Sequence, residues 1–259
     1  MIASLAFAGF LAGAVLGSFA SASSMAWIEK RPIFRKRSIC DHCGKALSSL
    51  QLVPVCSYLV LRAKCGYCGG RIPAFHFYVE LVSSLLCALF AVCYGLQWLT
   101  VFYMIAGTAM VAASSIDIKT HLLPDIVTIG CLALLPPIIA LDDRLTLMDA
   151  VLGYVWGGGI PLSLYLLFRV VRKKDCLGFG DIKLFAFGGA LAGWHALPFV
   201  LFFSSITGIV VFAIIGLFAE KKDLWELELP FGPFICAAVL AVLLMPDLPG
   251  MAYNVVCGY

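Results

Sequence analysis

The chain has 259 residues, of which 62% are hydrophobic and only 13% are charged, with a formal net charge of +3. A soluble domain has about a quarter charged residues, so this composition excludes an ordinary soluble globular protein. The apolar residues come in long blocks. The sequence therefore predicts an all-α polytopic membrane protein, whose helices satisfy their backbone hydrogen bonds internally.

The apolar blocks predict about eight transmembrane helices. We expect them at residues 3–28, 76–95, 98–116, 124–141, 147–169, 181–194, 197–218 and 230–246. The sixth is shorter than the roughly 20 residues of a full crossing, which a tilted helix or one packed against protein at its ends accommodates. No Lys or Arg precedes Lys30, so the first block is read as a retained membrane helix and not as a signal peptide. Within the fifth block, Gly157, Gly158 and Gly159 predict close packing against another helix.

Basic residues predict the orientation and the domain division. The segment 29–75 holds nine of the 18 Lys and Arg residues, and others follow the fifth and seventh blocks at 172–174 and 221–222. Cytoplasmic loops are enriched in Lys and Arg. We therefore expect a first transmembrane helix at 1–28, a small cytoplasmic domain at 29–75 and a membrane domain of about seven helices at 76–259. Both termini are then expected outside.

Four of the 11 cysteines form two CxxC pairs in the one clearly polar segment. They are Cys40, Cys43, Cys65 and Cys68, with 21 residues between the pairs. Two such turns can present four thiolates in a tetrahedral site, and this ligand set favours zinc. A closed shell of four thiolates leaves no position for water, so the metal is expected to be structural. A redox dithiol pair is the alternative. Cysteines inside apolar blocks, such as Cys87, Cys131 and Cys236, are read as packing residues.

Two aspartates lie next to apolar blocks on the predicted cytoplasmic side. Asp117 follows the third block, and Asp181 closes the segment Gly178-Phe179-Gly180-Asp181 before the sixth. Ionisable groups at a bilayer edge are costly and mark functional sites. An acid at a helix C-terminus also opposes the helix dipole, so Asp117 lacks an obvious structural role. For Asp181, capping the following helix is the structural alternative.

Further residues near these aspartates are expected to support them. Gly178 and Gly180 allow an extended substrate to approach the backbone closely. Lys183 follows Asp181, and Asp125 begins the fourth helix, where its charge complements the helix dipole. Glu80 lies just inside the second block and needs a partner or a role; a helix-packing hydrogen bond is the structural interpretation.

A pair of close carboxylates suits acid–base chemistry. Two such groups do not both ionise cheaply, so they share one proton. One acts as base on a bound water, and the other, protonated, polarises a scissile carbonyl and assists the leaving amine. This chemistry needs no metal.

An ordered set of motifs resembles the type IV prepilin peptidase family, which combines leader peptidase and N-methyltransferase activities, and does so over nearly the whole chain. The motifs are Gly17-Ser18-Phe19, the paired CxxC motifs, Val79-Glu80-Leu81, Asp117 with Leu123-Pro124-Asp125, Gly178-Phe179-Gly180-Asp181-Ile182-Lys183, and Pro230-Phe231-Gly232-Pro233. Two positions depart from the family pattern: Ser21 stands where Asn is usual, and His76 where a basic residue is common before the Val-Glu-Leu run.

The resemblance implies that Asp117 and Asp181 are the catalytic aspartates of an inner-membrane enzyme that cleaves at the cytoplasmic face. It implies prepilin or pseudopilin substrates of type IV pilus or type II secretion systems, and S-adenosylmethionine as methyl donor. Membrane lipids are expected as further partners, and nucleic acid is not. A transporter with a zinc-stabilised regulatory domain and a non-catalytic pilus or secretion assembly factor are the alternatives.

Overall fold

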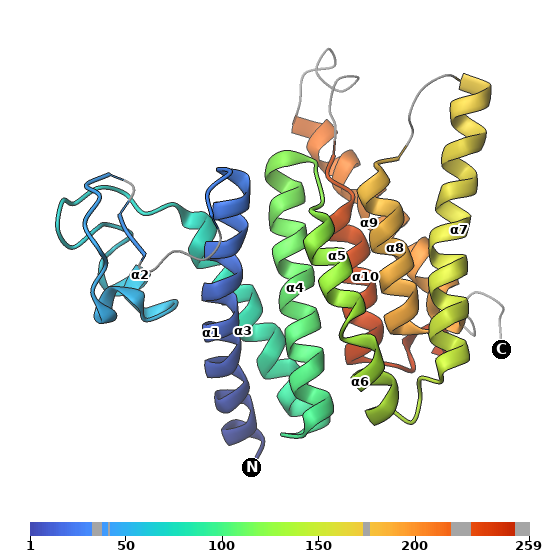
Figure 1. Ribbon diagram of the computed structural model, residues 1–259, viewed down its shortest axis with the longest axis horizontal. Coiled ribbons are helices and arrows are strands. Elements are labelled where there is room, and N and C mark those ends of the chain that lie inside the picture. Colours follow the sequence, from blue (N-terminus) through green and yellow to red (C-terminus); the bar gives the residue numbers. More distant parts are fainter. Residues whose placement is uncertain (33–37, 41, 173–176, 219–228, 252–259) are drawn as a thin grey trace. The chain divides into compact units, whose positions relative to one another are not determined.

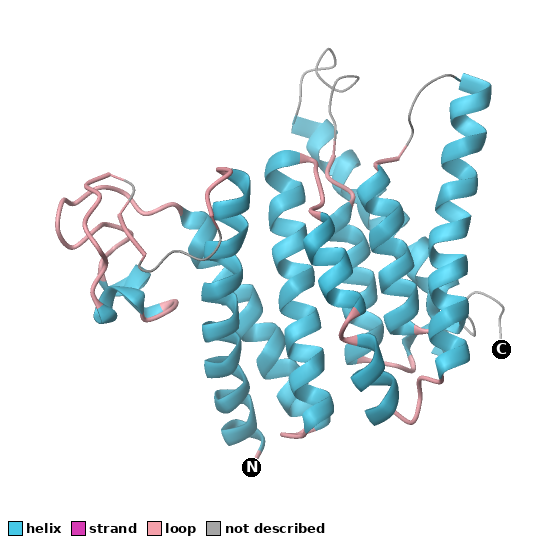
Figure 2. Cartoon of the chain, viewed as in Figure 1, coloured by secondary structure: helices cyan, strands magenta, loops and turns pink. Residues whose placement is uncertain are grey.

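The computed structural model describes residues 1–32, 38–40, 42–172, 177–218 and 229–251 (Figure 1). Over these residues the chain consists of helices and loops without a strand, which confirms the predicted all-α class (Figure 2). The basic positions 35–37, 173–174 and 221–222, on which the predicted orientation partly depends, lie outside the described residues. The chain divides into two compact units, Met1–Ser115 and Ile116–Tyr259.

The first unit contains two helices that pack tightly, α1 (Ile2–Ile28) and α3 (Ala74–Tyr94), followed by most of α4 (Trp98–Thr120). A Cβ at Gly9 would lie 2.6 Å from the Cys87 carbonyl oxygen, and one at Gly17 would lie 2.8 Å from the Ser83 Cβ. Residue numbers thus rise along α1 as they fall along α3. The two helices are therefore antiparallel, and the end of α1 lies beside the start of α3.

The segment between α1 and α3 holds little regular structure. It contains a 3-10 helix, η1 (Ser49–Leu52), the short helix α2 (Cys56–Val60), and two isolated bridges, Ile39 to Ala46 and Lys64 to Arg71. Each bridge closes a loop that carries one cysteine pair.

The second unit holds the end of α4 and the remaining helices. They are α5 (Asp125–Leu132), α6 (Leu135–Leu141), α7 (Leu147–Arg172), α8 (Phe179–Ala192), the 3-10 helix η2 (Trp194–Ala196), α9 (Leu197–Phe218) and α10 (Gly232–Leu244). The expected single helix at 124–141 is two helices, because the chain turns at Ala133 and Leu134 before Pro136 and Pro137.

Among the residues that the structure describes, five helices are long and apolar enough to cross a membrane: Ile2–Ile28, Ala74–Tyr94, Trp98–Thr120, Leu147–Val171 and Trp194–Phe218. Val127–Leu141 and Gly232–Leu244 are shorter apolar segments, and α8 has 14 residues. These findings support a multi-pass membrane protein. The number of eight crossings stays a prediction.

Glycines bring α7 and α8 into close contact. A Cβ at Gly153 would lie 2.1 Å from the Gly189 carbonyl oxygen, and one at Gly157 would lie 2.5 Å from the Phe185 carbonyl oxygen. No atom lies within 4 Å of a Cβ at Gly159. The glycine run therefore packs as predicted at Gly157, while Gly159 faces open space. Because α8 begins with the Gly178–Asp181 segment, this contact also holds a candidate site residue in place.

Gly157→Ala and Gly159→Ala test this packing as a matched pair within one helix. Gly157→Ala should destabilise the protein by about 1–3 kcal/mol, since its methyl group meets backbone that cannot rotate away. Gly159→Ala should be neutral or stabilise by up to about 1 kcal/mol through helix propensity. Thermal unfolding in detergent, followed by circular dichroism, measures both. Equal effects from the two variants would contradict the proposed contact.

Candidate active site and metal centre

Asp117 lies in the last turn of α4, where it is only 5% exposed. Its Oδ2 accepts a hydrogen bond of 2.9 Å from the backbone N–H of Gly232, the first residue of α10. A Cβ at Gly232 would lie 2.7 Å from that same oxygen, so a side chain at this position would displace the Asp117 carboxylate. Gly232 was not singled out from the sequence as a site residue, although its Pro-Phe-Gly-Pro motif was noticed.

Asp181 is the third residue of α8, whose N-cap is Gly178. The Gly178 backbone N–H donates to the Asp181 carboxylate, so the side chain reaches back over the helix start. Asp181 lies outside the five candidate membrane helices. The negative charge of Asp117 is close enough to act on Asp181. Two carboxylates that interact in this way do not both ionise cheaply.

The turn between α4 and α5 packs against the start of α8. Its residue His121 has a positive φ of 52° and donates its backbone N–H to the Asp117 carbonyl oxygen. A Cβ at Gly180 would lie 2.8 Å from the Cβ of Leu123. Gly180 therefore lets this turn approach α8 closely.

Lys183 and Asp125 join the same two elements by an ion pair of 2.5 Å between Nζ and Oδ1. Their side chains are 42% and 63% exposed. Exposed pairs of this kind add little stability, about 0–1 kcal/mol. The role of the ion pair is therefore to position α8 relative to the start of α5, and its contribution to stability is small.

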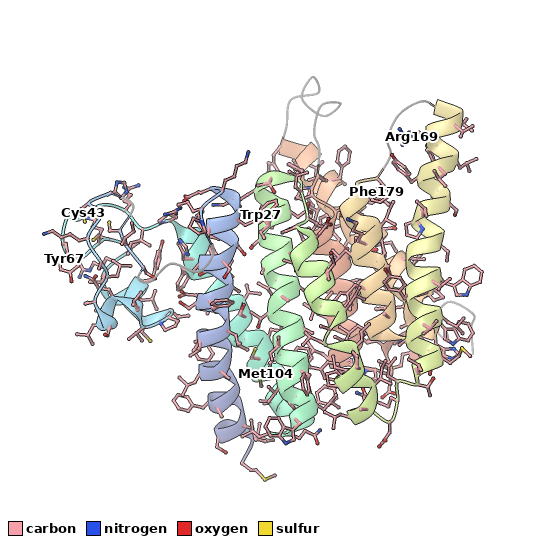
Figure 3. The ribbon with its side chains drawn as sticks, in the orientation of Figure 1. Trp27, Cys43, Tyr67, Met104, Arg169 and Phe179 are labelled. Carbon is pink, nitrogen blue, oxygen red and sulfur yellow. The ribbon has the colours of Figure 1, made fainter. Side chains whose placement is uncertain are left out.

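Aromatic and basic side chains extend from this point to α7. The Phe179 ring is 58% exposed, meets Tyr165 edge-on with centroids 6.1 Å apart, and lies 5.9 Å from the Lys183 Nζ. Arg169 donates to the Tyr165 hydroxyl. Figure 3 labels Arg169 on α7 and Phe179 at the start of α8. Tyr165 and Arg169 were not predicted as site residues, because nothing in their sequence neighbourhood marks them.

Glu80 belongs to the first unit, where it has a structural partner. Its Oε2 accepts a hydrogen bond of 2.8 Å from the backbone N–H of Val55, the N-cap of α2. Val55 has a φ of +61°, which is rare for a β-branched residue. Glu80 thus holds the segment between the cysteine pairs against α3.

The four predicted metal ligands come together. The Sγ atoms of Cys40, Cys43, Cys65 and Cys68 all lie within 4.8 Å of one another, and Cys40 and Cys68 are 3.9 Å apart. A tetrahedral site with Zn–S bonds of about 2.3 Å has sulfurs about 3.8 Å apart. The Cys40–Cys68 separation matches this value, and the four sulfurs are close enough together to hold a zinc ion. Figure 3 labels Cys43 and the nearby Tyr67 in this part of the chain.

The two cysteine turns have the same backbone pattern. The N–H of Gly44 donates to the Cys40 carbonyl and that of Gly69 to the Cys65 carbonyl, and both glycines have a φ near +70°. Backbone N–H groups of Tyr67 and Cys68 also lower the pKa of the Cys65 thiol to about 7. Such turns stabilise thiolates, which are the form that binds metal. His42, from the first turn, contacts the Arg71 carbonyl oxygen at 3.2 Å and joins the two turns.

Fold and sites together define a helical membrane protein with paired carboxylates at a helix boundary and a separate four-thiol cluster. Residues 11–94 match the profile of the bacterial peptidase A24 N-terminal domain, and residues 104–214 match that of the type IV leader peptidase family.

Curated relatives carry the same description. The prepilin leader peptidase/N-methyltransferase of Aeromonas hydrophila is 36% identical over 211 residues, 82% of this chain and 72% of the relative. Those of Legionella pneumophila and Pseudomonas aeruginosa are 33% and 32% identical, over 84% and 86% of this chain and 75% and 76% of the relatives. The chain belongs to the type IV leader peptidase family, as the sequence motifs indicated. No solved structure matches it.

The metal site has a direct test. Purified protein should contain about one zinc per chain by elemental analysis, and Cys40→Ser should lower this content to near zero. Cys56→Ser is the matched control, because Cys56 is an exposed thiol of the same segment outside the cluster. Loss of zinc should also speed proteolysis within 38–73, since so small a region has little core of its own. Full zinc content in Cys40→Ser would contradict the assignment.

Proposed function

We propose that the protein is a membrane aspartic endopeptidase that cleaves the leader peptides of type IV prepilins or pseudopilins and N-methylates the new N-terminus. Family membership and the relatives' shared description support this function. The Asp117 carboxylate is buried at the end of α4, is bonded to the Gly232 N–H and lies close enough to Asp181 for their charges to interact, and this arrangement supports the catalytic part. The protein is proposed to lie in the bacterial inner membrane. Its active site and metal domain then face the cytoplasm, and both termini lie outside.

The proposal includes the organisation predicted from the sequence. Eight membrane crossings are proposed, the three shorter ones being formed by α5 with α6, by α8 and by α10. Residues 1–28 form the first crossing, 29–75 the zinc-binding domain and 76–259 the peptidase domain. Zinc at the four cysteines is structural, because four thiolates close its coordination shell. S-adenosylmethionine is the methyl donor for the second activity.

In the cleavage step, Asp117 and Asp181 share one proton. Asp181 takes the protonated role, because the hydrogen bond from the Gly232 N–H stabilises the ionised form of Asp117. Asp117, whose Oδ2 accepts the Gly232 N–H, takes a proton from water. The water oxygen attacks the scissile carbonyl while the Asp181 proton stabilises the forming oxyanion. The proton held by Asp117 then passes to the leaving amine, and the C–N bond breaks.

Gly178 and Phe179 form the surface that the extended leader junction approaches. Gly178 and Phe179 are exposed, and Phe179 presents its ring at the start of α8. A substrate backbone can thus pass close to Asp181 without meeting a side chain at Gly178, whereas Gly180 is covered by Leu123 of the turn between α4 and α5. Lys183 and Asp125 position this surface and are not placed in contact with the reacting atoms.

Asp117→Asn and Asp181→Asn test the pair. Each should lower cleavage of a purified prepilin by about 10²–10⁴-fold, because an amide can neither accept nor donate the shared proton. The assay uses purified protein without other secretion components, which also excludes an assembly factor that acts only through partners. Zinc content and thermal stability serve as controls for folding. Cleavage retained by both variants would refute the carboxylate pair.

A charge exchange tests the Asp125–Lys183 pair. Asp125→Lys and Lys183→Asp should each lower kcat for cleavage by about tenfold, because a displaced α8 misplaces Asp181. The double variant restores an attractive pair and should recover most of that loss. KM should change little if the pair positions Asp181 and does not bind substrate. Additive losses in the double variant would instead indicate that each charge acts independently.

A further inference from the structure

The segment between the cysteine pairs presents an apolar surface. It is formed by Leu50 and Leu52 of η1, by Val53, and by Leu59 and Val60 of α2, which are respectively 82%, 43%, 42%, 60% and 79% exposed. All five lie within eleven consecutive residues, and η1 contacts α2. We propose that this apolar surface inserts into the interface of an anionic lipid leaflet. The inference goes beyond the proposed function and does not depend on it.

Two contacts hold α2 beside the first two turns of α3, which is a candidate membrane helix. Val55, the N-cap of α2, is hydrogen-bonded to Glu80, which lies six residues after the start of α3. At 1.5 Å per residue this is about 9 Å along the helix. Tyr58 of α2 stacks on Phe77 of α3 with ring centroids 4.8 Å apart.

The start of α3 is therefore the level at which α2 lies. Since Ala74–Tyr94 is a candidate membrane helix, its first two turns are at or inside the membrane boundary. Apolar side chains on α2 then face the region between lipid head groups and acyl chains. Interfacial helices bury apolar residues about 5–10 Å into that region, which matches the depth of Glu80.

The charge of the segment identifies the kind of lipid. Residues 38–73 contain four basic residues, Lys45, Arg62, Lys64 and Arg71, and one acidic residue, Asp41, so the segment has a net positive charge. Arg62 and Lys64 follow Val60 directly and are exposed. Basic residues beside an interfacial apolar surface attract anionic head groups. An anionic leaflet thus satisfies both the apolar and the basic parts of the surface, whereas a neutral apolar partner satisfies only the first.

Photo-crosslinking in the full-length protein tests the proposal. A benzophenone amino acid is placed at position 50 or 60, and at position 46 as a control. Ala46 is also exposed but belongs to the first cysteine turn. The protein is reconstituted in vesicles of phosphatidylethanolamine with 30% phosphatidylglycerol, irradiated and analysed by intact mass. No prepilin is present, so the result is independent of peptidase activity. Unchanged zinc content and thermal stability identify correctly folded variants.

Lipid adducts at positions 50 and 60, several-fold above those at 46, support the proposal. Their yield should fall about two- to fivefold in vesicles of phosphatidylcholine alone, and likewise in the Arg62→Gln/Lys64→Gln variant, because each basic residue loses its attraction to anionic lipid. Adducts with a second copy of the chain, adducts only within the chain, or lipid adducts no more frequent than at position 46 would overturn it. A charge-independent lipid adduct would overturn the anionic preference.

Discussion

The hydrogen bond from the Gly232 N–H to Asp117 joins positions 115 residues apart, and the candidate active site depends on it. The first N–H groups of a helix have no partner within that helix. Asp117 provides one for α10 while lying near the end of α4, where its charge opposes the dipole of its own helix. The favourable interaction of the Asp117 carboxylate with the N-terminus of α10 offsets its unfavourable interaction with the C-terminal dipole of α4. Asp181 has a similar environment at the start of α8, where the Gly178 N–H points at it. Both acids are thus held by the backbone at helix N-termini.

Close helix packing determines whether these two helix starts can meet. Glycines let α8 approach α7 at Gly153, Gly157 and Gly189, and a Cβ at Gly188 would lie 2.6 Å from the Cγ2 of Val239 on α10. Within a bilayer, lipid competes with protein for apolar contacts, so small residues that permit backbone approach largely decide which helices associate. The apolar body of the second unit therefore sets the separation of its two acids, although neither acid takes part in that packing.

Local patterns in the sequence were sufficient for the helical class, the four-cysteine cluster and the packing of Gly157. Each depends on residues close together in the chain or on a ligand set that allows few arrangements. The Gly232 contact could not be predicted, because no local pattern states which distant carboxylate a glycine must accommodate. The break between α5 and α6 was missed although Pro136 and Pro137 mark it, since the apolar run continues through them. For Glu80 a helix-packing hydrogen bond was predicted, whereas its partner is the Val55 backbone N–H in the segment between the cysteine pairs.

The acidic residues differ in whether their neighbours account for them. Some are balanced by a structural partner, and others lie beside a second acid. Asp142 is 6% exposed, and its carboxylate accepts two hydrogen bonds from the Arg144 guanidinium, so its charge is balanced where it stands. Glu80 is accounted for by the segment that it holds. Asp117 and Asp181 differ, because each is a neighbour of like charge to the other and their proximity costs free energy that no stabilising contact requires. A protein that needed only helix caps could use Ser or Asn at both positions. Two carboxylates there make sense for chemistry that moves a proton between them, and the type IV leader peptidase profile matches the part of the chain that contains both.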